Sequence, residues 1–227
     1  MKPGLELDHV SFRYGDLWVF RELTHTLPMG GNLVVIGENG VGKSTLLYLC
    51  AGLTQASTGH VYLSGHVPNP TRPSELFRNG VRRGFVFYAG GLLSNATALG
   101  NVTLALRYHA DVLGLSESQI DRRARDQLTE LRVAQTDFHA LPAHLSVGVR
   151  RRVSLARALA LSPNFLFLDD PDSNLDTQTK HLVYELLERK RDDPAVTLLV
   201  TTTSPELVER LGVPPHELAH GYLMARI

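Results

Sequence analysis

The chain has 227 residues, of which 43% are hydrophobic and 20% charged, enough for a sizeable core in one large or two small domains. Basic and acidic residues both number 23, so the sequence lacks the overall positive field typical of nucleic-acid-binding proteins. A single cysteine, Cys50, excludes an internal disulfide framework and is typical of a reducing compartment. We expect no secretory signal, because residues 1–6 contain no apolar h-region, and no membrane span, because no apolar run reaches roughly 18 residues.

Four short apolar runs predict buried strands at 33–36, 85–87, 165–168 and 197–200. They are continuous rather than alternating, which is typical of strands covered on both faces. Helical patterns predict helices at 43–53, after a capping box formed by Ser116 and Gln119, after Ser146, and around 182–187. The alternation predicts an α/β fold, over residues 1–227, with a mainly parallel sheet. We also expect a small antiparallel layer (before residue 35 and around 60–65) and a helical lobe over about 91–160.

A phosphate-binding loop is predicted at residues 37–44, which read G-E-N-G-V-G-K-S and match G-x-x-x-x-G-K-[ST]. The glycines allow backbone N–H groups to surround phosphate oxygens beside the positive end of the following helix. Lys43 is expected to reach the β- and γ-phosphates of ATP in catalysis, and Ser44 to ligate Mg²⁺. The predicted nucleotide-binding set here is Gly37, Asn39, Gly40, Gly42, Lys43, Ser44 and Thr45.

A second nucleotide element is predicted at residues 165–170, an apolar run that ends in Asp169 and Asp170. Ligands of open α/β sheets bind at the carboxyl ends of the strands. Asp169 is therefore expected to hold Mg²⁺ through its hydration shell.

Several further motifs occur in the order found in ABC ATPases, and the resemblance covers essentially the whole chain. Residues 145–152, L-S-V-G-V-R-R-R, resemble the signature L-S-G-G-Q-x-x-R, and residues 169–176, D-D-P-D-S-N-L-D, resemble D-E-P-x-x-x-L-D, which ends in the D-loop at Asp176. Tyr14 lies where these proteins carry an aromatic ring that stacks on adenine. The alternative for Tyr14 is a strand aromatic in a small core.

The resemblance implies the partners. Two ATPase subunits, identical or different, meet head to tail, and each ATP lies between the phosphate loop of one and the signature of the other. Ser146 and the Gly148 backbone would face the γ-phosphate bound by the partner, so that ATP closes the dimer and hydrolysis reopens it. Ser146 is equally compatible with a helix N-cap. A membrane permease is the implied second partner, placing this subunit at the cytoplasmic face of the inner membrane.

Departures from the family pattern fall on residues tied to hydrolysis. Asp170 replaces the Glu that orients the attacking water, and its side chain is one methylene shorter. Thr203 is assigned to the place of the switch histidine, and Tyr88 to the place of a glutamine that senses Mg²⁺. The signature has Val147 for its first glycine and Val149 for its glutamine. The sequence therefore predicts intact ATP binding and weakened hydrolysis.

Several alternatives remain open at this stage. An apolar Val149 followed by three arginines resembles the ATPases of lipid-trafficking systems of the Mla/MCE type, whereas residues 97–99 and the missing glutamine also suit haem-export ATPases. A non-catalytic module in which ATP only holds an assembly together is a rival from another class.

Residues 216–220 read H-E-L-A-H, a zinc-protease pattern that we attribute to coincidence. The arginines at 122–125 and 150–152 are interpreted as a solvated helix face or a docking edge, not a nucleic-acid site.

Overall fold

The computed structural model describes residues 3–226 and contains a central sheet in the order β5-β6-β7-β3-β8-β9. These strands span β5 (Arg83–Val86), β6 (Phe165–Asp169), β7 (Thr197–Thr201), β3 (Asn32–Ile36), β8 (His216–Ala219) and β9 (Tyr222–Ala225). Neighbours pair in parallel from β5 to β8, and only the β8–β9 pair is antiparallel. The predicted mainly parallel sheet is confirmed, while β8 and β9 were not expected from the sequence.

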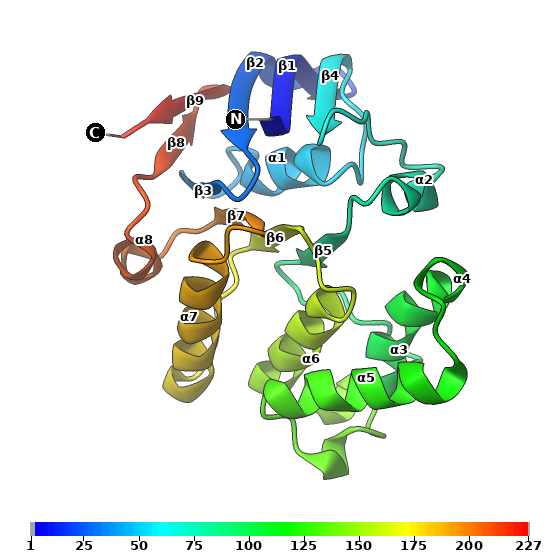
Figure 1. Ribbon diagram of the computed structural model, residues 1–227. Helices are drawn as coiled ribbons and strands as arrows, with labels where there is room; N and C mark the ends of the chain where they lie inside the picture. The colour runs from blue at the N-terminus through cyan, green and yellow to red at the C-terminus, as the bar shows by residue number, and fades with distance from the viewer. Residues whose placement is uncertain (1–2, 227) are drawn as a thin grey trace.

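The continuous apolar character of β6 has a direct structural reason. Phe165 and Phe167 belong to the core cluster shared with α1 (Lys43–Cys50), whereas Leu166 and Leu168 belong to the cluster shared with the helices on the opposite face. Because side chains alternate across a strand, both faces of β6 are covered and every residue of it is buried. Figure 1 shows α1 on one side of the central sheet and α6 and α7 on the other.

A three-stranded antiparallel sheet lies above α1 in Figure 1, in the order β2-β1-β4. Its strands are β1 (Pro3–Tyr14), β2 (Leu17–Pro28) and β4 (Thr58–Leu63). Leu5 and Leu7 of β1 are fully buried and share a core cluster with Leu46 and Leu47 of α1. This layer confirms the predicted antiparallel pieces. Helix α1 ends at Cys50, three residues earlier than expected, where Ala51 caps it and Gly52 turns the chain with a φ of 66°.

The helical lobe consists of α3 (Ala98–Tyr108), α4 (Ala110–Leu113), α5 (Glu117–Glu130) and α6 (Val147–Leu159), with short 3₁₀ turns at Gln135–Asp137 and Pro142–His144. Serine and threonine side chains begin the longer helices: Thr97 caps α3, and Ser116 caps α5 within the predicted capping box. Ser146 caps α6 by accepting a hydrogen bond from the Val149 N–H at 3.2 Å. In Figure 1 the lobe extends away from the antiparallel sheet.

Three further helices complete the fold: α2 (Pro73–Arg78), α7 (Thr177–Arg191) and α8 (Pro205–Leu211). The histidine pattern at 216–220 lies on strand β8 and the turn after it, not on a helix. The two histidines therefore lack the helical i, i+4 spacing that places the zinc ligands of that pattern on one helix face. Between residues 3 and 226, no helix combines the length and the apolar character that a membrane crossing requires.

Candidate nucleotide-binding site

The predicted phosphate loop connects β3 to the N-terminus of α1. Gly42 is the N-cap of α1 and has a φ of 107°, in the region that favours glycine. A Cβ atom at Gly42 would lie 2.5 Å from Val19 Cγ1 and 3.0 Å from the Phe20 ring, so the antiparallel sheet also requires glycine there. The free N–H groups at the start of α1 therefore point into the loop, which is the geometry of an anion site.

Lys43 lies across this loop and is only 6% exposed. Its ammonium group donates hydrogen bonds to the carbonyl oxygens of Gly37 at 2.8 Å and Glu38 at 3.0 Å. A buried ammonium needs partners, and the loop's own carbonyl groups supply two. Asn39 and Gly40 form the exposed tip of the loop. Lys43 is thus held where its charge can reach phosphate oxygens that the loop amides bind.

Tyr14 ends β1 next to this loop. Its hydroxyl group lies 3.3 Å from the Thr45 hydroxyl of α1, and its ring packs edge-on against Phe12 with a centroid separation of 4.8 Å. Tyr14 is 56% exposed, so it is not a buried aromatic of the small sheet. The exposed ring face favours its predicted stacking on a base; that role stays a prediction.

Asp169 ends β6 and is 1% exposed. Its Oδ1 accepts a hydrogen bond from the Thr201 hydroxyl at 2.7 Å, while its Oδ2 is buried with no hydrogen-bond partner among residues 3–226. A buried carboxylate oxygen without a partner is costly, so this position fits a bound cation. Carboxylate and hydroxyl oxygens are the donors that Mg²⁺ prefers, and Asp169 and Ser44 would hold it. Between residues 3 and 226, no three His, Cys, Asp or Glu side chains are arranged so that they could hold a metal ion together, so phosphate and water would supply the other ligands.

Asp170 follows in a left-handed conformation, with a φ of 42°. Its N–H donates to the Thr201 carbonyl at 3.0 Å, and its Oδ1 accepts a hydrogen bond from the Thr203 N–H at 2.9 Å. Burial raises the pKa of the Asp170 carboxyl above its ordinary value, the Thr203 N–H and Lys43 oppose this, and the neighbouring Asp169 adds to it. The carboxylate is therefore fixed to the loop after β7 and is destabilised as an anion.

The loop after β7 contains the two threonines that follow the strand. Thr203, predicted to replace a histidine, has an exposed side chain, and its backbone N–H is the group that holds Asp170. Thr202 is fully buried, and its hydroxyl accepts a hydrogen bond from the Ser204 N–H at 2.9 Å. The role of Thr203 toward phosphate stays a prediction.

The start of α6 packs against the start of α7. Gly148 is buried, and a Cβ atom there would lie 2.7 Å from Thr179 Oγ1 and 2.8 Å from Asp176 Oδ2. Asp176 is the N-cap of α7, accepting hydrogen bonds from the Thr179 N–H at 2.8 Å and the Thr179 hydroxyl at 2.9 Å. These bonds lower the pKa of the exposed Asp176 carboxyl. Ser146 remains exposed at the tip of α6.

The sequence profile of the ABC transporter family matches residues 20–173. The chain belongs to the ABC transporter family. It is 36% identical over 218 residues to the lipoprotein-releasing system ATP-binding protein LolD of Geobacter metallireducens, covering 93% of this chain and 94% of that protein. It is 33% identical over 205 residues to the sulfate/thiosulfate import ATP-binding protein CysA 1 of Chromobacterium violaceum, covering 89% of this chain but 55% of that protein.

Solved structures give the same result. The dimeric post-hydrolysis structure of the ATP-binding cassette MJ0796 with ADP and Pi superimposes with a TM-score of 0.85 at 26% identity, covering 96% of both chains. A second dimeric structure of MJ0796, described as a bacterial ABC transporter cassette, has a TM-score of 0.86 at the same identity and coverage. This chain is therefore the ATP-binding subunit of an ABC transporter, and its fold is that of the ABC ATPase.

The ABC signature helix α6 carries contacts that the sequence did not predict. Arg151 is 5% exposed and donates hydrogen bonds to the carbonyl groups of Phe87 at 3.0 Å and Tyr88 at 2.9 Å. Tyr88 itself, predicted in place of the Mg²⁺-sensing glutamine, is 52% exposed. Thr201, which holds Asp169, was also not predicted. Arg151 falls at a position that the signature leaves unspecified, and its burial corrects the interpretation of this arginine as part of a solvated helix face or docking edge. Thr201 belongs to no motif, and only the fold brings it to Asp169.

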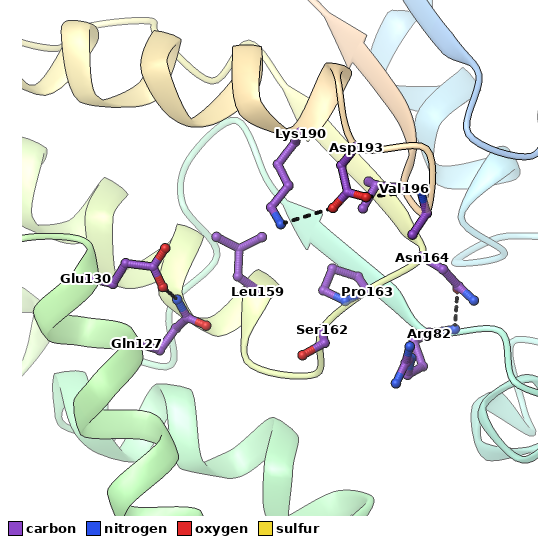
Figure 2. A pocket seen from close by; sticks show the side chains of 11 residues that line it. Arg82, Gln127, Glu130, Leu159, Ser162, Pro163, Asn164, Lys190, Asp193 and Val196 are labelled. Atoms are coloured by element: carbon purple, nitrogen blue, oxygen red, sulfur yellow. Dashed lines mark hydrogen bonds and ion pairs between the residues drawn. The ribbon is translucent and has the colours of Figure 1, made fainter.

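A separate cavity of about 360 Å³ lies at the opposite end of the central sheet. It is lined by residues that precede β5, β6 and β7, together with parts of α5, α6 and α7 (Figure 2). Its polar side chains pair among themselves: the Lys190 ammonium lies 3.9 Å from the Asp193 carboxylate, and the Gln127 amide donates to Glu130 at 2.7 Å. The cavity lies at the amino ends of the strands, so it is not the ABC nucleotide site.

Proposed function

We propose that this subunit binds Mg-ATP at the loop before α1 and, by ATP-driven closure with a second ATPase subunit, powers a permease that moves a lipid or a lipid-linked molecule. One observation carries the nucleotide part: the buried, unpartnered Oδ2 of Asp169 at the strand end beside the phosphate loop. A cation there needs a phosphate-bearing ligand to complete its shell.

In this proposal the loop amides and Lys43 bind the phosphates, Ser44 and Asp169 hold the magnesium ion, and Tyr14 stacks on the base. Bound Mg²⁺ would neutralise charge on the β- and γ-phosphate oxygens. Ser146 at the exposed tip of α6 meets the γ-phosphate of the ATP held by the partner subunit. The two dimeric structures of MJ0796 support an ATPase pair of this kind.

Slow hydrolysis is the second part of the proposal. A water that attacks the γ-phosphate must be held by a group within hydrogen-bond reach. The Asp170 side chain is short, and one of its oxygens is already engaged by the Thr203 N–H. Misplacement of a catalytic group by about 1 Å can lower a rate about 10²-fold. The presence of Asp170 where the family has Glu thus supports the proposal that this subunit binds ATP but hydrolyses it slowly.

The permease is proposed to dock on an apolar row of the helical lobe. Leu104 and Tyr108 lie one turn apart on α3, and Val112 follows on α4; they are 48%, 60% and 47% exposed. Leu93, 44% exposed, extends the row toward the loop that follows β5. Exposed apolar side chains gathered on one helix face are typical of an interaction surface. Such docking would place the subunit at the cytoplasmic face of the inner membrane.

The identity of the cargo as a lipid is the most specific part of the proposal. It is supported by the resemblance of residues 149–152 to lipid-trafficking ATPases and by the near-complete overlap with LolD proteins, including that of Paramagnetospirillum magneticum at 32% identity over 92% of both chains. By contrast, the sulfate/thiosulfate and methionine import subunits, which are 33% and 37% identical to this chain, are about twice as long as the region that matches it. Haem export is the competing cargo.

The test is co-purification of the subunit from membranes, identification of the bound permease and its cargo, and an ATPase assay of the intact complex. Replacing Leu104 and Val112 by Asp is expected to remove the permease while Mg-ATP affinity stays unchanged. Replacing Val67 by Asp is the matched control and should keep the permease, because Val67 is an apolar residue, 52% exposed, outside the helical lobe. A stable, ATP-dependent assembly that contains no membrane protein would instead support the non-catalytic module.

A further inference from the structure

One face of the signature helix is bonded to the loop that follows β5. Arg151, Ser154 and Arg157 are spaced three residues apart, so they lie on the same side of α6. Ser154 donates to the Gly90 carbonyl at 2.7 Å, and Arg157 donates to the carbonyl groups of Gly91 at 2.6 Å and Gly90 at 3.2 Å. With the two bonds from Arg151, these side chains hold the backbone of residues 87–91, which we call the clamped loop.

Arg151 and Ser154 are both buried, and Arg151 in addition lies near three carboxylates. It is almost fully buried, which lowers the pKa of its guanidinium, and the carboxylates of Asp172, Asp169 and Asp170 partly offset that effect. Its bonds to the clamped loop, and the pocket that it lines together with Asn174 from the loop that follows β6, place the side chain between these two loops. A pocket of about 270 Å³ opens at this junction, and Tyr88, Val147, Arg151 and Asn174 contribute to its lining.

The clamped loop begins where β5 ends at Val86, and the Phe87 ring packs against Phe85 of β5 and Tyr48 of α1 at centroid separations of 4.4 and 6.1 Å. On its far side Asn101 of α3, fully buried, holds the next segment: its amide nitrogen donates to the carbonyl oxygens of Leu93 and Ala96 at 3.2 and 3.0 Å. The chain from residue 87 onward is thus bonded to the helical lobe. The two bonds from Arg151 link the Tyr88 backbone to α6, whose N-cap Ser146 lies five residues, or about 7.5 Å, before Arg151.

We propose that Arg151 is a positioning residue for ATP hydrolysis, which holds the Phe87–Tyr88 backbone against α6 so that the clamped loop and the signature end of α6 move as one body. The inference rests on the proposed function, because it requires the Tyr88 loop to respond to bound Mg-ATP. In this role Arg151 links the nucleotide site of its own subunit to the signature that faces the nucleotide of the partner subunit. Arg151 touches neither nucleotide nor permease in this role.

The test compares wild type with Arg151→Gln and Arg151→Lys by hydrogen exchange, with and without Mg-AMP-PNP. The chain is used at concentrations where sedimentation shows it to be monomeric, so that no partner protects the signature. In wild type, amides 87–91 and 146–149 are expected to gain protection together. In R151Q, amides 87–91 should still gain protection when Mg-AMP-PNP is added, whereas amides 146–149 should not. The affinity of R151Q for Mg-AMP-PNP should stay within about threefold of the wild-type value.

Steady-state kinetics provide the second readout. R151Q is expected to lower kcat about tenfold, the scale of a positioning loss, with little change in KM. Lysine keeps the charge but reaches one carbonyl group instead of two, so R151K should lie between wild type and R151Q. Arg123→Gln, which removes a surface guanidinium bonded to Ser162 at 2.7 Å, is the control and should match wild type.

Each outcome decides one claim. Signature amides that respond equally in wild type and R151Q, with unchanged kcat, overturn the inference and leave the proposed function standing. Wild type that fails to bind Mg-AMP-PNP overturns the proposed function itself. If R151Q does not fold, R151K decides: exchange and kcat equal to those of wild type overturn the inference, and intermediate values support it.

Discussion

The phosphate loop and the loops that face it present different kinds of groups to a nucleotide. Residues 37–44 offer backbone N–H groups and one ammonium, held by a glycine cap that the neighbouring sheet requires. The loops after β5, β6 and β7 offer side chains instead: Tyr88, Asp170 and the threonines beyond Thr201. The first region matches the family pattern at every motif position, and the second departs from it at several.

The difference follows from what each region must do. Phosphate binding by amides depends on backbone shape, which glycines and a helix N-terminus fix almost independently of other side chains. Activation of a water depends on the length and charge of single side chains, so each can change without unfolding the loop. Binding and hydrolysis are therefore separable in this chain: substitutions in the phosphate loop should change nucleotide affinity, and substitutions in the facing loops should change the hydrolysis rate.

The largest effect is expected from Lys43→Ala. It removes the ammonium that bridges the Gly37 and Glu38 carbonyl groups and the charge that the phosphates need. Mg-ATP affinity should fall at least about 100-fold, which corresponds to roughly 2.7 kcal/mol. Isothermal titration calorimetry measures this, with Lys190→Ala, on the far side of the sheet, as the control. Unchanged affinity in K43A would remove the phosphate-loop assignment.

Asp170→Glu tests the loop that follows β6, and it should increase activity where Lys43→Ala removes it. The added methylene extends the carboxylate toward the attacking water, and kcat is expected to rise about 10- to 100-fold with little change in nucleotide affinity. Single-turnover hydrolysis of radiolabelled ATP by the purified dimer measures the rate.

Asp170→Ala sets the baseline for that experiment. If D170E and wild type both hydrolyse ATP no faster than D170A, the length of this side chain is not what limits turnover. Wild type that hydrolyses ATP at an ordinary ABC rate without a permease would contradict the proposal of weakened hydrolysis directly.

The sequence predicted the fold well wherever one local rule decides. The runs at 165–168 and 197–200 became buried strands because both faces of β6 and β7 are covered. The capping box at Ser116 formed as predicted. The hairpin of β8 and β9 was missed because its strand character comes from pairing with distant segments: β8 pairs with β3, and β9 pairs with β8.

The site was predictable only where a motif carries it. Motif spacing singled out Lys43, Asp169 and Ser146, and the structure places Lys43 across the loop, Asp169 at the end of β6 and Ser146 at the start of α6; their roles toward nucleotide stay predictions. Arg151 and Thr201 were missed, since their roles arise from pairing between segments about 64 and 32 residues apart, which no local pattern encodes. Gly148 was assigned to phosphate binding, and the structure adds a packing reason for it.

Gly148→Ala tests that packing reason with a smaller expected effect. The added Cβ meets the Asp176 cap and Thr179, an overpacking cost of about 1–3 kcal/mol, while alanine gains up to about 1 kcal/mol of helix propensity. A net loss of about 1 kcal/mol should lower the melting temperature by roughly 2–4 °C. Gly100→Ala in α3, where the new Cβ has a nearest contact of 3.2 Å, is the matched control. G148A that is as stable as G100A would show that Asp176 moves aside freely.

The smallest effect concerns the charge on Asp170. Because burial raises the pKa of this carboxyl in the folded chain, the folded state binds the proton more tightly than the unfolded state does. The resulting stability is present below the ordinary pKa of Asp, about 3.9, and is lost as the pH rises through the raised folded value. At pH 7 the wild-type chain therefore carries an anion whose burial is only partly offset by the Thr203 N–H and Lys43, and Asp170→Asn, which keeps an oxygen for the Thr203 N–H, should be more stable by about 0.5–1 kcal/mol, or roughly 2 °C. Thermal melts of the nucleotide-free chain at pH 4 and pH 7 measure this, and the gap between D170N and wild type should narrow at pH 4. A gap that widens on acidification would mean that Thr203 and Lys43 stabilise the anion more than burial destabilises it, which would make Asp170 an ordinary ionised carboxylate available to hold water.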